Sequence, residues 1–101
     1  MGLEVSWASS YIEILKLGAC VSFRPRGNSM KPLINSGDLV DIEPISGPLE
    51  KGDIVLCKVH GRQYLHLIKA IKGSEYLIGN NHGGINGWTS TIYGKCVRIS
   101  K

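Results

Sequence analysis

The sequence predicts a mainly β domain of about seven short strands, with one short helix near the N-terminus. Short stretches rich in β-branched residues recur along the chain, and turns containing glycine separate them at regular spacing. A length of 101 residues suits one domain with a modest core. We therefore expect a single domain over residues 1–101, with a helix and lead-in over residues 1–20 and a β core over residues 21–101.

The helix is expected over residues 10–17. Ser10 and Glu13 have the spacing of a capping box, in which each side chain accepts a hydrogen bond from an amide left free at the helix start. Ile12 and Leu15 share one face, and Gly18 favours a helix end at that point.

The strands are expected where β-branched or alternating apolar residues recur between turns. The clearest alternation is at residues 38–43, and the apolar run 54–59 follows Gly52 and Asp53. The expected strands cover residues 20–23, 38–43, 54–59, 64–71, 75–78 and 92–99. Residues 80–87 are rich in Gly and Asn, so we expect a loop there.

Composition and charge narrow the functional classes. Hydrophobic residues make up 43% of the chain and charged residues 20%, which is ordinary for a soluble globular protein. The net charge of +4 is spread along the chain and there is one Phe, which argues against a nucleic-acid-binding surface. No stretch approaches the roughly 20 apolar residues that span a bilayer, so we expect a cytoplasmic protein with no membrane anchor.

The cysteines and histidines do not form a metal-binding pattern. Cys20, Cys57 and Cys96 are odd in number and include no CxxC pair, so we expect buried, reduced thiols. The three histidines lie in unrelated contexts without paired ligand spacing. We therefore expect neither a metal nor another cofactor.

A serine and a histidine provide the minimum parts of an activated nucleophile. Ser29 follows Gly27 in a turn, and His66 lies in a strand-like apolar run. A histidine can accept a proton at neutral pH because its ordinary pKa is about 6.5. The alternatives are that Ser29 is an ordinary turn residue and that His66 is a core histidine. Lys58 and Lys69 are other possible bases, which we expect to be solvated charges.

Three blocks of sequence resemble the LexA-like and signal-peptidase-like serine peptidases, the S24 and S26 groups. The first block covers residues 26–32 and 36–40 around Ser29, the second is residues 52–55, and the third covers residues 64–68 and 78–81. The resemblance implies a coiled β fold, a Ser29 nucleophile and a general base at His66. It also implies that an extended peptide or protein substrate docks beside a strand edge.

The chain departs from the family pattern at two kinds of position. LexA-like members have a lysine where His66 stands, whereas a histidine there is typical of the endoplasmic-reticulum and archaeal type of signal peptidase. That branch usually has acidic residues where this chain has Asn80 and, a little further on, Asn86.

Several neighbouring residues are candidates for supporting roles. Asn80 or Asn81 could orient the imidazole through an amide oxygen, although both also suit a turn. The conformation of Gly27 and Asn28 could expose the Ser29 N–H as a donor to an oxyanion. Candidates for substrate binding are Met30, Arg26 and Trp88.

Some of these candidates have a purely structural interpretation. Trp88 could instead anchor its loop, and the cations at Arg24, Arg26 and Lys31 could form a solvated rim rather than attract an acidic peptide. Asp38 and Asp53 each follow a glycine and are expected to stabilise turns.

The sequence therefore predicts a serine endopeptidase-like domain with a Ser29–His66 dyad. One alternative is a non-catalytic peptide- or protein-binding module on the same fold, favoured by the two asparagines. A weaker alternative is a self-cleaving regulatory domain, for which the bond between Gly18 and Ala19 would be the target. That bond lies only ten residues before Ser29 (29 − 19 = 10).

Overall fold

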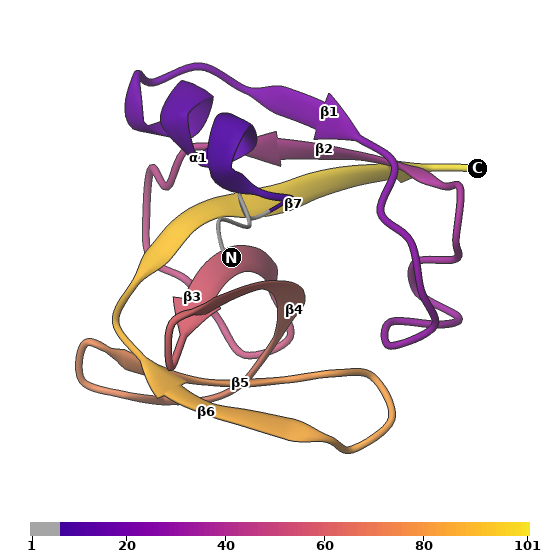
Figure 1. Ribbon diagram of the computed structural model, residues 1–101. Coiled ribbons are helices and arrows are strands. Elements are labelled where there is room, and N and C mark those ends of the chain that lie inside the picture. The colour runs from indigo at the N-terminus through magenta and orange to yellow at the C-terminus, as the bar shows by residue number, and fades with distance from the viewer. Residues whose placement is uncertain (1–6) are drawn as a thin grey trace.

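A computed structural model describes residues 7–101, which form one antiparallel sheet of seven strands and one helix (Figure 1). Alternating apolar residues and intervening glycine turns produce this mainly β architecture, as the sequence predicts. The elements are α1 (Ser9–Lys16), β1 (Val21–Phe23), β2 (Leu39–Glu43), β3 (Ile54–Val59), β4 (Arg62–Lys72), β5 (Glu75–Gly79), β6 (Ile85–Thr89) and β7 (Ile92–Ser100).

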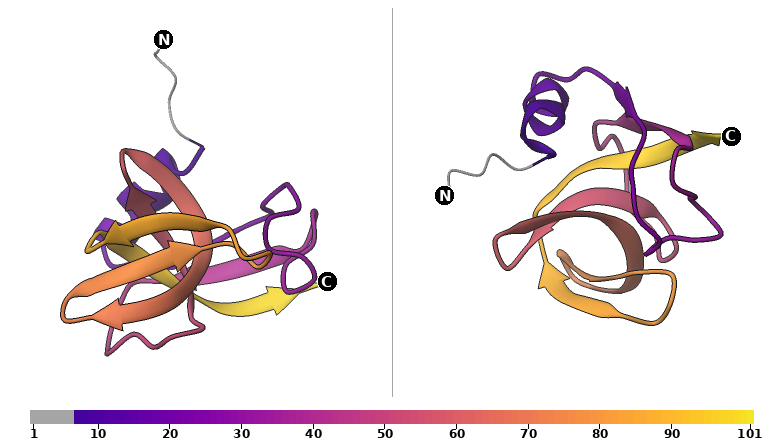
Figure 2. Two further views of the ribbon diagram at one scale, coloured as in Figure 1. Left: turned by 90° about the horizontal axis from the view of Figure 1, so that it is seen from below. Right: turned by 45° about the vertical axis from the view of Figure 1, so that its right-hand side comes forward.

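The sheet coils back on itself. Its strand order is β1-β2-β7-β3-β4-β5-β6, so three strands separate β7 from β6 although they follow one another in the chain. The Thr89 hydroxyl at the end of β6 donates to the Lys58 carbonyl of β3 at 2.6 Å, and the Lys58 N–H donates to the Thr91 carbonyl. These bonds bring β6 across to β3, and the views in Figure 2 show the resulting curl.

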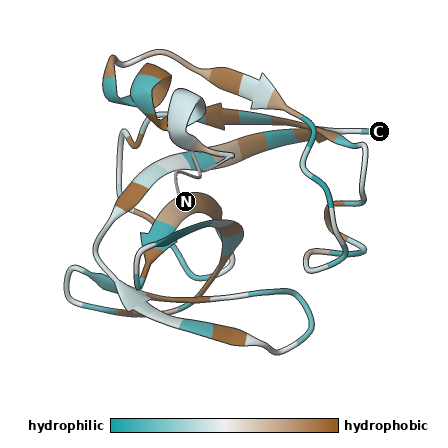
Figure 3. Cartoon of the chain, in the orientation of Figure 1, coloured by the Kyte–Doolittle hydropathy of each residue, from teal (hydrophilic) through white to brown (hydrophobic). Residues whose placement is uncertain are grey.

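The curl gives β3 and β4 two buried faces. On β3, Leu56 belongs to a core that also contains Ile12 and Leu15 of α1, whereas Val55 and Cys57 belong to a second cluster. Leu65 and Leu67 of β4 likewise join the first core, and Ile68 joins the second. Burial on both faces suits the consecutive apolar residues of these strands, at 54–57 on β3 and 67–68 on β4. Figure 3 shows brown, apolar segments alternating with teal, polar ones in this part of the sheet.

Helix α1 begins one residue earlier than expected and without the predicted capping box. Ala8 is its N-cap residue, so Ser10 lies inside the first turn and its hydroxyl does not cap the helix. The C-terminal end does follow the prediction. Gly18 has φ of +89°, and the N–H groups of Gly18 and Ala19 donate to the carbonyls of Leu15 and Ile14, respectively, as in a Schellman motif.

One strand lies where the sequence predicted a loop. Strand β6 takes up the last three residues of the expected loop at residues 80–87, and it completes the seven strands of the sheet. The sequence does not predict this strand, because Asn and Gly have low strand propensity. Pairing with β5 determines its conformation instead. The other six strands lie within two residues of their expected bounds.

The thiols differ from the expectation of uniform burial. Cys57 is buried, and loss of hydration raises the pKa of its thiol to about 12. Cys96 is half-buried and Cys20 is exposed, and all three are free. Within the part of the chain that the structure describes, no helix has both the length and the apolar character needed to cross a membrane.

Candidate functional site

Strand β4 holds His66 at the floor of a cleft. The histidine pairs with Val55 across the β3–β4 ladder, and its ring stacks on Tyr64 with centroids 5.1 Å apart. Only 8% of the residue is exposed. Because β4 is fixed by pairing on both sides, the imidazole has a defined position and direction.

A tight turn presents Ser29 to that imidazole. Gly27 has φ of +106°, a conformation that residues with a side chain rarely adopt. The Lys31 N–H donates to the Asn28 carbonyl, and the Ile34 N–H donates to the Met30 carbonyl. Met30 is buried in the core, whereas Ser29 is exposed, so the turn anchors one side chain and offers the next to solvent.

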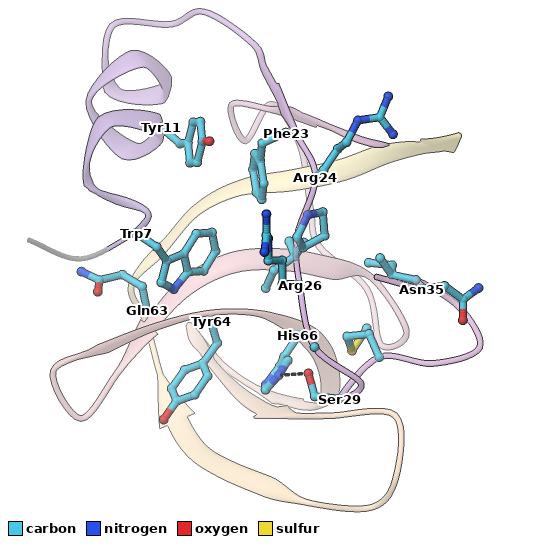
Figure 4. A pocket seen from close by; sticks show the side chains of 15 residues that line it. Trp7, Tyr11, Phe23, Arg24, Arg26, Ser29, Asn35, Gln63, Tyr64 and His66 are labelled. Carbon is cyan, nitrogen blue, oxygen red and sulfur yellow. Dashed lines mark hydrogen bonds between the residues drawn. The ribbon is translucent and has the colours of Figure 1, made fainter. Parts of the chain in front are cut away.

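The Ser29 hydroxyl and the His66 imidazole are within hydrogen-bond distance. Ser29 Oγ lies 3.1 Å from His66 Nε2, the contact marked in Figure 4. On the other side of the ring, His66 Nδ1 lies 2.7 Å from Asn86 Oδ1. An amide oxygen only accepts hydrogen bonds, so this contact assigns the proton to Nδ1 and leaves Nε2 free to accept from the Ser29 hydroxyl.

Asn86 reaches His66 because it is the extra residue of a β-bulge. Ile78 pairs with Gly87 and Gly79 pairs with Ile85, so Asn86 between them has no partner on β5. A bulge of this kind turns a side chain out of the regular alternation of the strand. Asn86 therefore occupies the position beside the imidazole that the sequence had suggested for Asn80 or Asn81.

The structure corrects the roles of Asn80 and Asn81. Asn80 Oδ1 accepts the backbone N–H groups of His82 and Gly84, both at 2.8 Å, so it stabilises its own loop. Asn81 instead holds the serine turn. Its backbone N–H donates to the Ser29 carbonyl at 2.8 Å, and its Nδ2 donates to the Lys31 carbonyl at 2.9 Å.

His82 adds a third bond between the β5–β6 loop and the serine turn. Its Nε2 donates to the Asn28 carbonyl at 2.8 Å. With the two bonds from Asn81, this contact fixes three carbonyls of the turn that carries Ser29. Among residues 7–101, no acceptor forms a hydrogen bond with the Ser29 N–H. This N–H therefore remains free to donate a hydrogen bond to an oxyanion.

The cleft beside Ser29 and His66 has a volume of about 480 Å³. Of the three candidates for substrate binding, Met30 and Arg26 line it and Trp88 does not. Trp88 lies on β6, pairs with Leu77 of β5 and is 42% exposed. The aromatic residues of the cleft are Trp7, Tyr11, Phe23 and Tyr64 (Figure 4). Sequence reasoning missed them because helix α1 and strand β1 approach β4 only in the folded chain.

The aspartates and lysines lie largely as expected. Asp38 Oδ2 accepts the Asn35 N–H, and this bond and the Lys101 ammonium lower the pKa of the Asp38 carboxyl. Asp53 Oδ2 accepts the Glu50 N–H, so both aspartates stabilise turns. Lys58 is exposed on β3, as expected for a solvated charge. Lys69 differs from that expectation, because it is half-buried and is the unpaired residue of a bulge in β4.

The environment of His66 favours its neutral form. Burial lowers the pKa of the imidazole, the bond from Asn86 partly offsets this, and the positive charge of Lys69 lowers the pKa further. A histidine whose folded pKa is depressed leaves stability unaffected above its unfolded pKa of about 6.5. As the pH falls below that value, the unfolded chain takes up the proton first and stability is lost until the folded pKa is passed.

We expect the imidazole of His66 to titrate with a midpoint below 6.5. Asn86→Asp should raise that midpoint, because a carboxylate stabilises the imidazolium that the amide leaves uncompensated. Lys69→Gln should raise it less. NMR titration of the His66 ring protons in the wild type and the two variants measures these midpoints. The same midpoint in all three proteins would contradict the assigned contacts.

Residues 7–101 contain no cluster of three or more His, Cys, Asp or Glu side chains placed to bind a metal ion. A hydroxyl, an imidazole held in the accepting tautomer and a free N–H together can support nucleophilic attack on a carbonyl.

Comparison with known proteins identifies one family. The family model described as Peptidase S24-like matches residues 4–86, which include the serine turn, β3, β4, β5 and the start of β6. A search of curated proteins gave no match.

Proposed function

The chain belongs to the Peptidase S24-like family, and from that membership we propose that it is a serine endopeptidase in which Ser29 is the nucleophile and His66 the general base. The observation that carries this proposal is the 3.1 Å contact between Ser29 Oγ and His66 Nε2 at the floor of an open cleft. The family membership supports peptidase chemistry in general terms. The dyad is inferred from the geometry.

In the proposed reaction, His66 Nε2 takes the hydroxyl proton as Ser29 Oγ bonds to the peptide carbonyl carbon. The imidazolium then gives this proton to the leaving amine as the C–N bond breaks, which leaves an ester on Ser29. Water hydrolyses that ester with His66 again acting as the base. The Ser29 N–H would stabilise the negative oxygen of each tetrahedral intermediate.

Asn86 has a specific part in this scheme. Its Oδ1 accepts from His66 Nδ1–H and so maintains the tautomer that can receive the serine proton. An amide carries no net charge, however, and it stabilises the imidazolium less than a carboxylate does. Together with the nearby charge of Lys69, this favours a dyad with a neutral base and slow turnover.

The neutral side chain of Asn86 beside His66 also favours a second candidate, a module that binds peptides without cleaving them. A site with a neutral orienting residue could retain the cleft and lose useful catalysis. Self-cleavage between Gly18 and Ala19 has less support, because both N–H groups are hydrogen-bonded in the helix end. The helix end would have to unwind before that bond could enter the cleft.

A fluorophosphonate probe distinguishes the peptidase from the binding module. The probe phosphonylates an activated serine hydroxyl and releases fluoride, so intact-mass and peptide mass spectrometry should find one adduct, on Ser29. Labelling should be lost in His66→Ala and should persist in Ser46→Ala, which removes an exposed hydroxyl outside the cleft. A wild-type protein that stays unlabelled across neutral and alkaline pH would favour the binding module.

A further inference from the structure

The charged residues that line the cleft are basic. Arg24 and Arg26 line it, and no Asp or Glu among residues 7–101 lines it. Arg24 Nη1 donates to the Gly37 carbonyl at 2.6 Å, so this guanidinium is engaged in the turn. Arg26 is exposed, and no residue within 7–101 forms an ion pair or a side-chain hydrogen bond with it.

The position of Arg26 suits contact with a bound peptide. It lies three residues before Ser29, on the segment that leads from β1 into the serine turn. Figure 4 shows its side chain between the aromatic residues near α1 and the Ser29–His66 pair. A guanidinium presents a planar fork of donors that fits a carboxylate with two parallel hydrogen bonds.

An aromatic group forms the far end of the same cleft. Phe23 stacks on Tyr11 with ring centroids 4.3 Å apart, and Trp7 packs against Phe23 at 5.7 Å. Trp7 is 51% exposed although its ring belongs to this group. Its open face can therefore pack against a large apolar side chain that enters the cleft.

We propose that the cleft selects acidic peptides, in which an Asp or Glu side chain pairs with Arg26 and a bulky apolar side chain packs on Trp7. This inference rests on the proposed function, since it names the substrate class of the same cleft. In an extended peptide, side chains two residues apart point to the same side at about 7 Å spacing. One short strand can thus present both groups along the cleft while its backbone passes Ser29.

Two measurements test the preference. The first is cleavage of a peptide library in which each position is varied among acidic, neutral and basic residues. The second is binding of matched fluorescent peptides to the Ser29→Ala protein, measured by fluorescence polarisation. Peptides with Glu should be bound and cleaved about two- to fivefold better than those with Gln, because an ion pair that is open to solvent contributes at most about 1 kcal/mol.

Arg26→Gln should abolish the preference for Glu over Gln, and Trp7→Ala should weaken the preference for a bulky apolar residue. Lys72→Gln is the matched control, because it removes an exposed cation outside the cleft and should leave the preference intact. The acidic preference should also fall as salt increases from 50 to 500 mM, as expected for a contact that is open to solvent.

The outcomes separate this inference from the proposed function. Cleavage without any preference for acidic peptides would overturn the inference and leave the peptidase standing. Acidic binding without cleavage would support the inference and overturn the peptidase. A single-stranded oligonucleotide that displaces the acidic peptide at lower concentration than the peptide itself would assign Arg26 to a phosphate backbone and overturn the inference.

Discussion

Ser29→Ala is expected to lower kcat/KM for peptide cleavage by at least about 10³-fold, because it removes the atom that bonds to the substrate carbonyl. His66→Ala should cause a similar loss, since the Ser29 hydroxyl would lose the base that lies 3.1 Å from it. The double variant should be little worse than either single one, because the two residues act as a unit. Initial rates on a cleaved library peptide, with all proteins at equal concentration, measure these ratios.

The control for that experiment is Ser46→Ala, which should retain wild-type rates. Circular dichroism of each variant checks that the fold is intact, and we expect no change in Ser29→Ala because Ser29 is exposed and sits in a turn. Losses in the two single variants that multiply in the double variant would show independent roles and contradict a dyad. Cleavage that persists in Ser29→Ala would assign the activity to another residue or to a contaminant.

Gly94→Ala is expected to lower the free energy of unfolding by about 3 kcal/mol, the upper part of the range for overpacked sites. Gly94 lies on β7 where this strand passes between β2 and β3. A Cβ atom there would lie 2.7 Å from the Glu43 carbonyl oxygen and 2.7 Å from Ile42 Cγ2. Because the first of these is backbone, a side-chain rotation cannot relieve the contact.

Urea denaturation with circular dichroism detection measures this loss as a lower midpoint at an unchanged slope. Gly47→Ala is the matched control, since a Cβ at that exposed position would meet nothing within 4 Å. It should change stability by less than about 0.5 kcal/mol. Equal midpoints for the two variants would mean that β7 does not pass β2 and β3 as closely as described.

Local sequence determined most of the strands. Alternation placed β2, where Val40 and Ile42 are buried. An apolar run rich in β-branched residues placed β3, and the turn at Gly61 placed the start of β4. Such patterns can be read from a short stretch of sequence, because side chains alternate between the two faces of a strand. One buried face gives alternation, and two buried faces give a continuous apolar run. Strand β6 escaped detection because its Asn and Gly residues carry no such pattern and its pairing with β5 comes from the fold.

The sequence by itself also indicated Ser29 and His66, through a glycine turn, an embedded histidine and the resemblance of three blocks to known peptidases. Only the tertiary structure decided which residues support them. Asn86 reaches His66 through a bulge, and Asn81 holds the serine turn through bonds to Ser29 and Lys31. The aromatic residues of the cleft come from α1 and the segment before it, from β1 and from β4, and do not include Trp88. Bulges and contacts between distant segments depend on the pairing of whole strands, and no short window of sequence contains that information.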